Sequence, residues 1–339
     1  MQRKTGVAGR FFLRHPRAAM KDEALIGSLP AGMADRVVSA RAADGVATVV
    51  LDATGLDASA RKEIERDLTE RLKAIAGIAT VRVAMTAEKR ARRVLAVASG
   101  KGGVGKSTLA ANLAIALKRS GIKVGLVDAD IYGPSQPTIL AASGTKPVAQ
   151  DGKLVPVPTP AGVPLLSMGQ IIAPGRAIAW RGPMTGGALS QLVDADWGDT
   201  ELLVVDMPPG TGDVQLTMIQ KHKPAGAVLV STPQDLALID AARAGQLFEQ
   251  QGVPIIGLVE NMAGYVCPHC GESSDPFGAG GVEAAAGRLG LPFLGRIPLS
   301  LAIRESGDAG VPPAAGDGPD AEPFRAIAAK VAEWLAANE

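Results

Sequence analysis

The chain has 339 residues, which is enough for about two domains and a sizeable hydrophobic core. Hydrophobic residues make up 47% of the chain and aromatic residues only 3%, so we expect cores built from Ala, Val, Leu and Ile. The 35 Lys and Arg residues balance 34 Asp and Glu residues, which excludes recruitment of nucleic acid or a membrane by net charge alone. No apolar run approaches the roughly 20 residues of a membrane span.

Residues 1–21 form a basic segment. Up to residue 20 they contain no acidic side chain, and the basic residues are Arg3, Lys4, Arg10, Arg14 and Arg17. The segment lacks the apolar stretch of a secretory signal and is poor in serine. We therefore expect a disordered N-terminal extension, or an upstream start codon, rather than a targeting sequence.

Residues 22–86 predict a small α+β domain. Strands expected at 37–42 and 46–51 flank Asp44-Gly45, a dipeptide typical of a β-hairpin. A helix with one apolar face is expected at 59–76, and alternation at 78–85 predicts a further strand. Residues 87–93, with the sequence AEKRARR, are typical of a solvated, charged linker.

From residue 94 to residue 339, apolar strand patterns alternate with helical patterns. Strands that are apolar on both faces are buried on both faces, which predicts an α/β domain with a mainly parallel sheet and helices on both sides. Residues 133–175 are rich in Pro and Gly and predict a surface excursion with short strands, and a final helix is expected at 323–337. The apolar runs lie at 94–99, 123–127, 202–205, 227–230, 254–259 and 292–297.

The segment 100–107, GKGGVGKS, fits the phosphate-binding pattern G-x-x-x-x-G-K-[ST] and lies between a predicted strand and a predicted helix. Backbone N–H groups of such a loop surround a phosphate at the positive end of the helix dipole. Lys106 is expected to reach the β- and γ-phosphates of ATP, and the Ser107 hydroxyl to ligate Mg²⁺. The predicted nucleotide-binding residues are Gly100, Lys101, Gly102, Gly103, Val104, Gly105, Lys106, Ser107 and Thr108.

Three carboxylates follow predicted strands of the same sheet. The apolar run 202–205 ends in Asp206, the pattern of a Walker B strand, whose carboxylate holds Mg²⁺. Asp128 and Asp130 follow the strand at 123–127 and share a face of an extended segment. We predict that Asp130 orients the attacking water and that Asp128 belongs to the Mg²⁺ shell.

Cys267 and Cys270 form a C-x-x-C pair and are the two cysteines of the sequence. Their spacing argues against a disulfide scaffold and for metal or redox chemistry in a reducing compartment, which predicts a cytoplasmic protein. Tetrahedral zinc and a [4Fe–4S] cluster each need four ligands, and His15 and His222 lie far away in sequence. One chain therefore supplies half a site, and a symmetric dimer would supply the rest on its two-fold axis.

Taken together, these motifs resemble the Mrp/ApbC family of P-loop ATPases, which carry and deliver iron–sulfur clusters. The resemblance covers about 94–311 and rests on SGKGGVGKST, DADIYGPSQP, VVDMPPGTGDVQLT, ENMAGYVCPHCG, FGAGG and GRIPL. It implies a homodimer that uses ATP and Mg²⁺, holds one [4Fe–4S] cluster, and works with cluster scaffold proteins and apo iron–sulfur proteins. It implies neither a nucleic-acid nor a membrane partner.

The resemblance also assigns roles to single residues. A second lysine in the P-loop, here Lys101, marks the deviant Walker A group, in which it crosses the dimer interface to the partner's nucleotide. Lys101 and Lys106 are thus predicted to be catalytic together with Asp128 and Asp130, and Asn261 to contact the adenine. Cys267 and Cys270 are predicted to hold the iron–sulfur cluster.

The front domain resembles a small domain that is often fused to bacterial members of the family. Here the acidic-proline opening of that domain is missing near residues 25–30, and its cysteine is absent from residues 53–60. These departures weigh against a cluster- or partner-handling role for residues 22–86.

Two other functions share some of these motifs. A dithiol oxidoreductase also uses C-x-x-C, but its low thiol pKa usually needs a helix N-terminus, and Ser273 to Pro276 argue against a helix that starts at Cys267. A partitioning ATPase that binds membrane or DNA would explain Lys101 and Asp130, yet it leaves the cysteines without a role. Zinc in place of the cluster is a variant of the carrier hypothesis.

Overall fold

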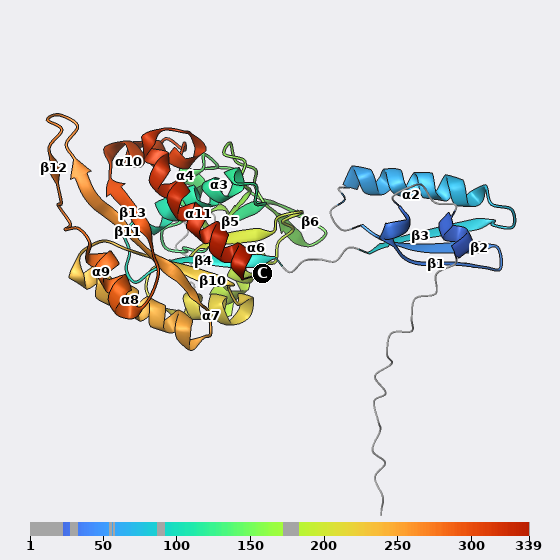
Figure 1. Ribbon diagram of the computed structural model, residues 1–339, viewed down its shortest axis with the longest axis horizontal. Helices are drawn as coiled ribbons and strands as arrows, with labels where there is room; N and C mark the ends of the chain where they lie inside the picture. Colours follow the sequence, from blue (N-terminus) through green and yellow to red (C-terminus); the bar gives the residue numbers. More distant parts are fainter. Residues whose placement is uncertain are drawn as a thin grey trace, which may run out of the picture. The chain divides into compact units, whose positions relative to one another are not determined.

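The computed structural model describes residues 23–27, 33–53, 56, 58–86, 92–171 and 183–338. They belong to two compact units, Met1–Arg90 and Ala91–Glu339 (Figure 1). The extension predicted at residues 1–21 and most of the linker predicted at 87–93 lie outside the described residues.

The first unit is a three-stranded sheet with one long helix packed against it (Figure 1). The hairpin predicted around Asp44-Gly45 is present, and both residues have the positive φ (52° and 74°) that such a turn requires. The first two strands are antiparallel, whereas the second and third are parallel. The elements are α1 (Glu23–Gly27), η1 (Ala34–Arg36), β1 (Val37–Ala43), β2 (Val46–Asp52), α2 (Ala58–Lys73) and β3 (Thr80–Thr86).

The second unit is built on an eight-stranded sheet that is parallel except at one edge hairpin, which confirms the predicted α/β fold. The strand order is β12-β11-β10-β4-β9-β5-β8, and β13 also pairs with β11. The strands are β4 (Arg93–Ser99), β5 (Val124–Asp128), β8 (Leu165–Ser167), β9 (Leu202–Asp206), β10 (Gly226–Ser231), β11 (Ile255–Val266), β12 (Ser273–Ser274) and β13 (Phe293–Leu299).

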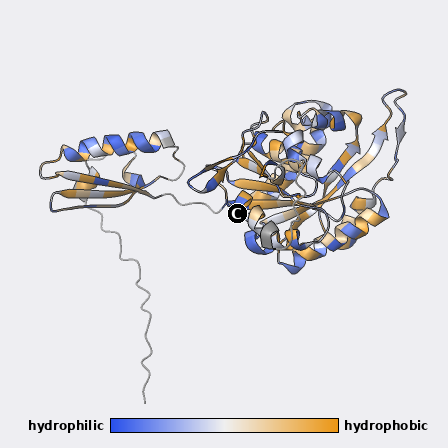
Figure 2. Cartoon of the chain, turned by 180° about the vertical axis from the view of Figure 1, so that it is seen from behind, coloured by the Kyte–Doolittle hydropathy of each residue, from blue (hydrophilic) through white to orange (hydrophobic). Residues whose placement is uncertain are grey.

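Helices cover both faces of this sheet and bury one hydrophobic cluster on each side. Figure 2 shows the hydrophobic residues gathered on the strands, with hydrophilic residues on the outer sides of the helices. One cluster includes residues of α3 (Lys106–Arg119), α10 (Leu301–Asp308) and α11 (Glu322–Ala337). The other includes residues of α6 (Pro183–Val193), α7 (Asp213–His222), α8 (Asp235–Gln250) and α9 (Gly281–Leu289). No helix among the described residues is long and apolar enough to span a membrane.

The remaining elements are short and lie mostly between β5 and α6 or before α11. They are α4 (Gln136–Ile139), β6 (Val148–Gln150), β7 (Lys153–Val155), α5 (Met168–Ile171), η2 (Pro313–Ala315) and η3 (Pro319–Ala321).

Two expectations about this unit were wrong. The region 133–175 is not simply a surface excursion, because β8 is fully buried and pairs with β5 in the central sheet. The strand predicted to end at Val259 continues as β11 to Val266, since it keeps pairing with β13 and then with β12 beyond its apolar segment. Asn261 therefore lies within a strand rather than after one.

Candidate nucleotide site and cysteine turn

The predicted P-loop connects β4 to α3, so the glycine-rich segment stands at the N-terminus of a fourteen-residue helix. Gly103 and Gly105 have φ values of +78° and +79°, a conformation that side chains with a Cβ rarely adopt. A Cβ on Gly100 would lie 2.0 Å from the backbone of Asp240 in α8. The loop thus needs glycine for its own packing as well as for the approach of a phosphate.

Asn261 packs against this loop and hydrogen-bonds to its backbone. Its Nδ2 atom donates a hydrogen bond to the carbonyl of Val104 (2.8 Å), and a Cβ on Gly105 would lie 2.0 Å from the same nitrogen. The side chain is buried and joins β11 to the P-loop. The predicted contact with adenine stays a prediction, and the contact seen here is with the backbone of the loop.

Lys106 and Asp206 form a buried ion pair at the centre of the site. The Lys106 ammonium contacts Oδ1 of Asp206, and the two side chains are 7% and 0% exposed. The second carboxylate oxygen, Oδ2, accepts a hydrogen bond from Nε2 of Gln136 (2.8 Å). The Lys106 ammonium also lies 3.5 Å from Oγ of Ser107. The structure thus brings together three of the predicted residues, from the P-loop and from the end of β9.

Asp128 lies beside Asp206, because the two residues are register partners at the ends of β5 and β9. Its carboxylate is fully buried and accepts hydrogen bonds from Oγ of Ser167 (2.9 Å) and from the backbone N–H groups of Gln136 (3.2 Å) and Asp130 (3.2 Å). Burial, followed by the charge of Asp206, raises the pKa of Asp128 to about 8, and the three hydrogen bonds oppose this rise. Asp128 thus connects β5, β8 and α4 beside Asp206, and its predicted place in the Mg²⁺ shell stays a prediction.

Asp130 and Lys101 are the more accessible of the predicted catalytic residues. Both are half-buried. Oδ1 of Asp130 accepts hydrogen bonds from the backbone N–H groups of Tyr132 (3.1 Å) and Gly133 (3.2 Å), which fixes the turn after β5. The Lys101 ammonium lies 3.5 Å from Oε1 of Gln234, just before α8.

Sequence reasoning missed two polar residues of this site, Gln136 and Ser167. Both are fully buried, and both hydrogen-bond to the carboxylates described above. Gln136 lies inside the motif DADIYGPSQP, which was a signal that could have singled it out. Ser167 follows a two-residue apolar stretch and carries no comparable signal.

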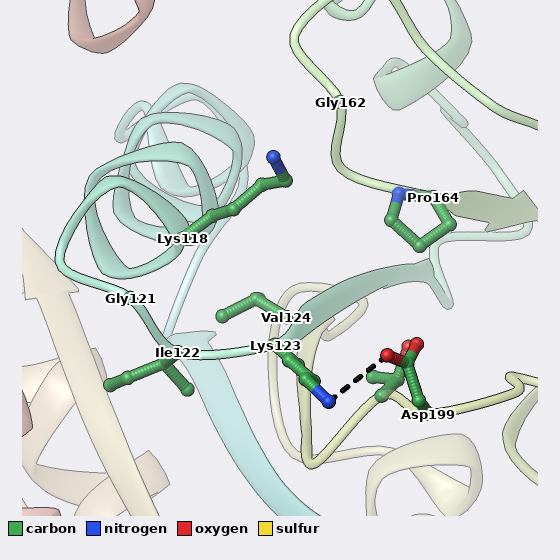
Figure 3. A pocket seen from close by; sticks show the side chains of 9 residues that line it. Lys118, Gly121, Ile122, Lys123, Val124, Gly162, Pro164 and Asp199 are labelled. Atoms are coloured by element: carbon green, nitrogen blue, oxygen red, sulfur yellow. Dashed lines mark ion pairs between the residues drawn. The ribbon is translucent and has the colours of Figure 1, made fainter. Parts of the chain in front are cut away.

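A separate pocket of about 350 Å³ lies at the other end of α3 (Figure 3). Lys118 points toward it, and Lys123 beside it pairs with Asp199 at 3.1 Å. Since α3 rises by about 1.5 Å per residue from Lys106, this pocket is about 20 Å from the P-loop. None of the predicted site residues lines it.

The cysteine pair lies in the turn of the edge hairpin formed by β11 and β12 (Figure 1). The N–H of Cys267 donates to the carbonyl of Glu272 (2.9 Å), and the N–H of Gly271 donates to the carbonyl of Cys267 (2.9 Å). Cys267 is half-buried and Cys270 is exposed. Backbone hydrogen bonds from Cys270 and His269, joined by the Cys270 side chain, lower the pKa of the Cys267 thiol. This favours the thiolate form that binds metals.

One chain offers this turn only two thiol ligands. Among the described residues, no three His, Cys, Asp or Glu side chains are grouped so that they could hold a metal ion. No helix begins at Cys267, as the residues after it predicted. The turn therefore presents two thiols, and that of Cys270 is exposed.

The fold and the phosphate loop define a P-loop NTPase. MinD from Pyrococcus furiosus, a cell-division ATPase, superimposes with a TM-score of 0.54 at 24% identity, over 71% of this chain and 99% of that one. Residues 90–332 match the family described as ParA: NUBPL iron-transfer P-loop NTPase, and the chain belongs to this family. The resemblance inferred from the motifs is confirmed.

Individual relatives agree with this assignment. The iron–sulfur protein required for mitochondrial NADH dehydrogenase in Arabidopsis thaliana is 51% identical over 221 residues, which are 65% of this chain and 70% of that protein. The iron–sulfur cluster carrier protein of Escherichia coli K12 is 45% identical over 248 residues, or 73% and 67% of the two chains. A nucleotide-binding protein from Archaeoglobus fulgidus, solved with ADP, has a TM-score of 0.59 at 37% identity and covers 68% of this chain and 91% of its own.

Proposed function

We propose that this chain is an ATP-hydrolysing carrier of iron–sulfur clusters that works as a homodimer. In this proposal Cys267 and Cys270 of both chains hold one [4Fe–4S] cluster as cargo between them. The observation that carries it is the accessible half-site at the hairpin turn, because two thiols need two more ligands to complete a four-iron cluster. The cargo passes from scaffold proteins to apo iron–sulfur proteins in the cytoplasm.

The nucleotide site contains the groups that ATP and Mg²⁺ require. The hydroxyl of Ser107 and the carboxylate of Asp206 are hard oxygen donors, which suit Mg²⁺. Lys106 would bind the β- and γ-phosphates of ATP, and Asp206, with which Lys106 pairs in the structure, would hold the Mg²⁺. Asp130 then orients the attacking water, while the buried Asp128 holds the turn in which Asp130 lies.

Strand β11 supports a coupling between the nucleotide and the cargo. It carries Asn261, which contacts the P-loop at Val104, and it leads directly into Cys267. A change in the P-loop on ATP binding or hydrolysis is passed along this strand to the cysteine turn. Lys101 reaches the nucleotide of the partner chain, so the nucleotide state also sets the contact between the two half-sites.

Anaerobic reconstitution with iron and sulfide tests the cargo. We expect about one four-iron cluster per dimer, and loss of bound iron in Cys267→Ala and Cys270→Ala. His269→Ala, in the same turn, is the matched control and should keep the iron. The proposal fails if Cys267→Ala binds as much iron as the unmodified chain, or if the protein stays monomeric with nucleotide and iron present. Elemental analysis of anaerobically purified protein distinguishes iron from zinc.

The accessible C-x-x-C turn, whose backbone hydrogen bonds lower the pKa of the Cys267 thiol, favours a second function, dithiol exchange between Cys267 and Cys270. This alternative predicts a reduction potential in the range of thioredoxins and no retention of iron. A redox titration of the metal-free protein, read beside its iron content, separates the two functions.

A further inference from the structure

Gln136 contacts three segments of the nucleotide site through its side-chain amide and its backbone N–H. Gln136 is the first residue of α4 and is fully buried. Its Nε2 atom donates to the carbonyl of Ser107 in α3 (2.9 Å) and to Oδ2 of Asp206 at the end of β9 (2.8 Å). Its backbone N–H donates to Oδ2 of Asp128 at the end of β5 (3.2 Å). One residue thus ties the P-loop helix to both buried carboxylates.

The orientation of this amide follows from its partners. A backbone carbonyl and a carboxylate that is paired with Lys106 are acceptors, so the nitrogen must face them and the oxygen must face away. That oxygen, Oε1, is buried and has no hydrogen-bond partner among the residues that the structure describes. Oγ of the preceding Ser135 is also buried and has no hydrogen-bond partner among the described residues. Buried polar atoms in proteins almost always have a hydrogen-bond partner, so the unpaired Oε1 acceptor of Gln136 needs an explanation.

A magnesium-bound water is the donor that suits this place. Mg²⁺ gives up its waters reluctantly and is usually held by one or two carboxylates together with substrate phosphates. Waters in its shell are strong donors, and the carboxylate expected to hold the metal, Asp206, is the one that Gln136 contacts. The Oε1 atom belongs to the amide whose nitrogen contacts that carboxylate and, having no partner in the described part of the chain, it is free to accept a hydrogen bond from such a water.

We propose that Gln136 is a positioning residue for magnesium in this site. Its Nε2 atom fixes Oδ2 of Asp206 so that the carboxylate presents its other oxygen once Lys106 has turned to the phosphates. Its Oε1 atom accepts a hydrogen bond from a water of the metal shell. This inference rests on the proposed nucleotide function and adds a residue that contacts neither the phosphate nor the cargo.

Nucleotide binding with and without the metal tests this role. The affinity of the full chain for a non-hydrolysable ATP analogue is measured by calorimetry in Mg²⁺ and in EDTA, and the ratio of the two affinities is the magnesium enhancement. Gln136→Leu removes the donor and the acceptor at similar size. We expect the enhancement to fall at least about tenfold, as for the loss of a charge-assisted hydrogen bond, while the affinity in EDTA changes by less than about threefold.

Gln215→Leu is the matched control. Gln215 is also fully buried, its Nε2 atom donates to the carbonyl of Pro208, and its Oε1 atom is likewise without a partner among the described residues. It has no hydrogen bond to Asp206 there, so this variant should keep the magnesium enhancement within about twofold. Loss of the enhancement in both variants would mean that any buried amide in this region has the same effect, which overturns the inference.

A second variant covers the case in which Gln136→Leu does not fold, as judged by thermal unfolding. Gln136→Asn keeps the amide but withdraws it by one methylene, and the same loss of enhancement is expected. A folded variant with an unchanged enhancement overturns the inference, and so does an unmodified chain that binds the analogue equally in Mg²⁺ and in EDTA. Failure of iron loading, in contrast, overturns only the proposed cargo.

Discussion

The ammonium of Lys106 and the carboxylate of Asp206 meet in a buried ion pair between residues one hundred positions apart in the sequence. The pair joins the first residue of α3 to the last residue of β9. Both charges are nearly inaccessible, so each depends on the other for compensation. A lysine usually assigned to phosphate binding thus also has a structural role.

Replacing Lys106 by alanine is expected to impair both roles. Removal of one partner of a buried pair leaves the other charge uncompensated, which lowers the free energy of unfolding by about 3–5 kcal/mol. Loss of charge-assisted hydrogen bonds, each worth about 1.5–3 kcal/mol, weakens nucleotide binding at least about tenfold. Urea unfolding and calorimetry with an ATP analogue measure the two effects.

The double variant Lys106→Ala with Asp206→Asn separates these effects. It should recover much of the stability, because the buried charge is gone, but none of the nucleotide affinity. Lys118→Ala is the control, since Lys118 is exposed on the same helix. An unfolding free energy of Lys106→Ala equal to that of the control would contradict the structural role.

The contact between Gly105 and Asn261 predicts unequal effects of alanine in the P-loop. A Cβ in a left-handed conformation costs about 1–2 kcal/mol, and this penalty applies to both Gly103→Ala and Gly105→Ala. Gly105→Ala should cost more, because its Cβ would lie 2.0 Å from Nδ2 of Asn261, whereas a Cβ on Gly103 meets nothing within 4 Å. Chemical unfolding in the absence of nucleotide measures the difference.

Truncation of Asn261 tests whether its contact with a Cβ at position 105 causes this difference. In an Asn261→Ala background the clash is removed, and Gly105→Ala should then cost about as much as Gly103→Ala. If the two glycine variants remain unequal in that background, the collision with Asn261 is not the reason for the difference.

His222 predicts a loss of stability in mild acid. Its side chain is only 6% exposed, and burial lowers its pKa, with the charge of Asp194 opposing and that of Lys221 adding to the shift. The unfolded chain therefore binds a proton more readily than the folded chain below about pH 6.5. The contribution is constant above that pH, and stability falls as the pH drops from there toward the lowered pKa of the folded state.

Urea unfolding at pH 7.5 and pH 5.5 measures this dependence. Relative to the unmodified chain, His222→Gln should gain stability at pH 5.5 over pH 7.5, because the group that takes up the proton is gone, while the opposite contribution of Asp128 is common to both proteins. His269→Gln, on the exposed cysteine turn, should leave the loss unchanged. Equal pH dependence in all three proteins would show that other groups cause it.

The parts of the site that the sequence predicted are those whose residues form a motif of fixed spacing or directly follow an apolar strand. The P-loop follows from fixed spacing between a strand and a helix, and Asp206 from an apolar run that ends in a carboxylate. Ser167 was missed because its contact with Asp128 depends on the pairing of β5 with β8. The sequence of a three-residue strand does not indicate which strand it will pair with. Gln136 was missed because its role depends on hydrogen bonds to residues 29 and 70 positions away in the sequence.

The end of β11 shows a further limit of pattern reading. Glu260 directly follows the apolar run at 254–259, and the pattern gave it no role. In the structure its fully buried carboxylate accepts hydrogen bonds from the backbone of Gly280 and Val282 and from Arg296. The Glu260 carboxylate thus holds the N-terminus of α9 in place. The hydropathy pattern shows where the apolar part of a strand ends. The end of the strand itself depends on how far its backbone pairs with neighbouring strands.

Strand β11 also limits the distance between the phosphate loop and the cysteine turn. Asn261, which contacts the phosphate loop, lies within β11, and Cys267 comes six positions later, directly after the last residue of that strand. The pairing with β13 is irregular between Asn261 and Tyr265. At roughly 3.3 Å per residue, their backbones are separated by at most about 20 Å. The length of this short segment therefore limits how far the thiols can lie from the phosphate loop, and inserting one residue into it would displace the thiols without changing the side chain of Asn261 or of Cys267.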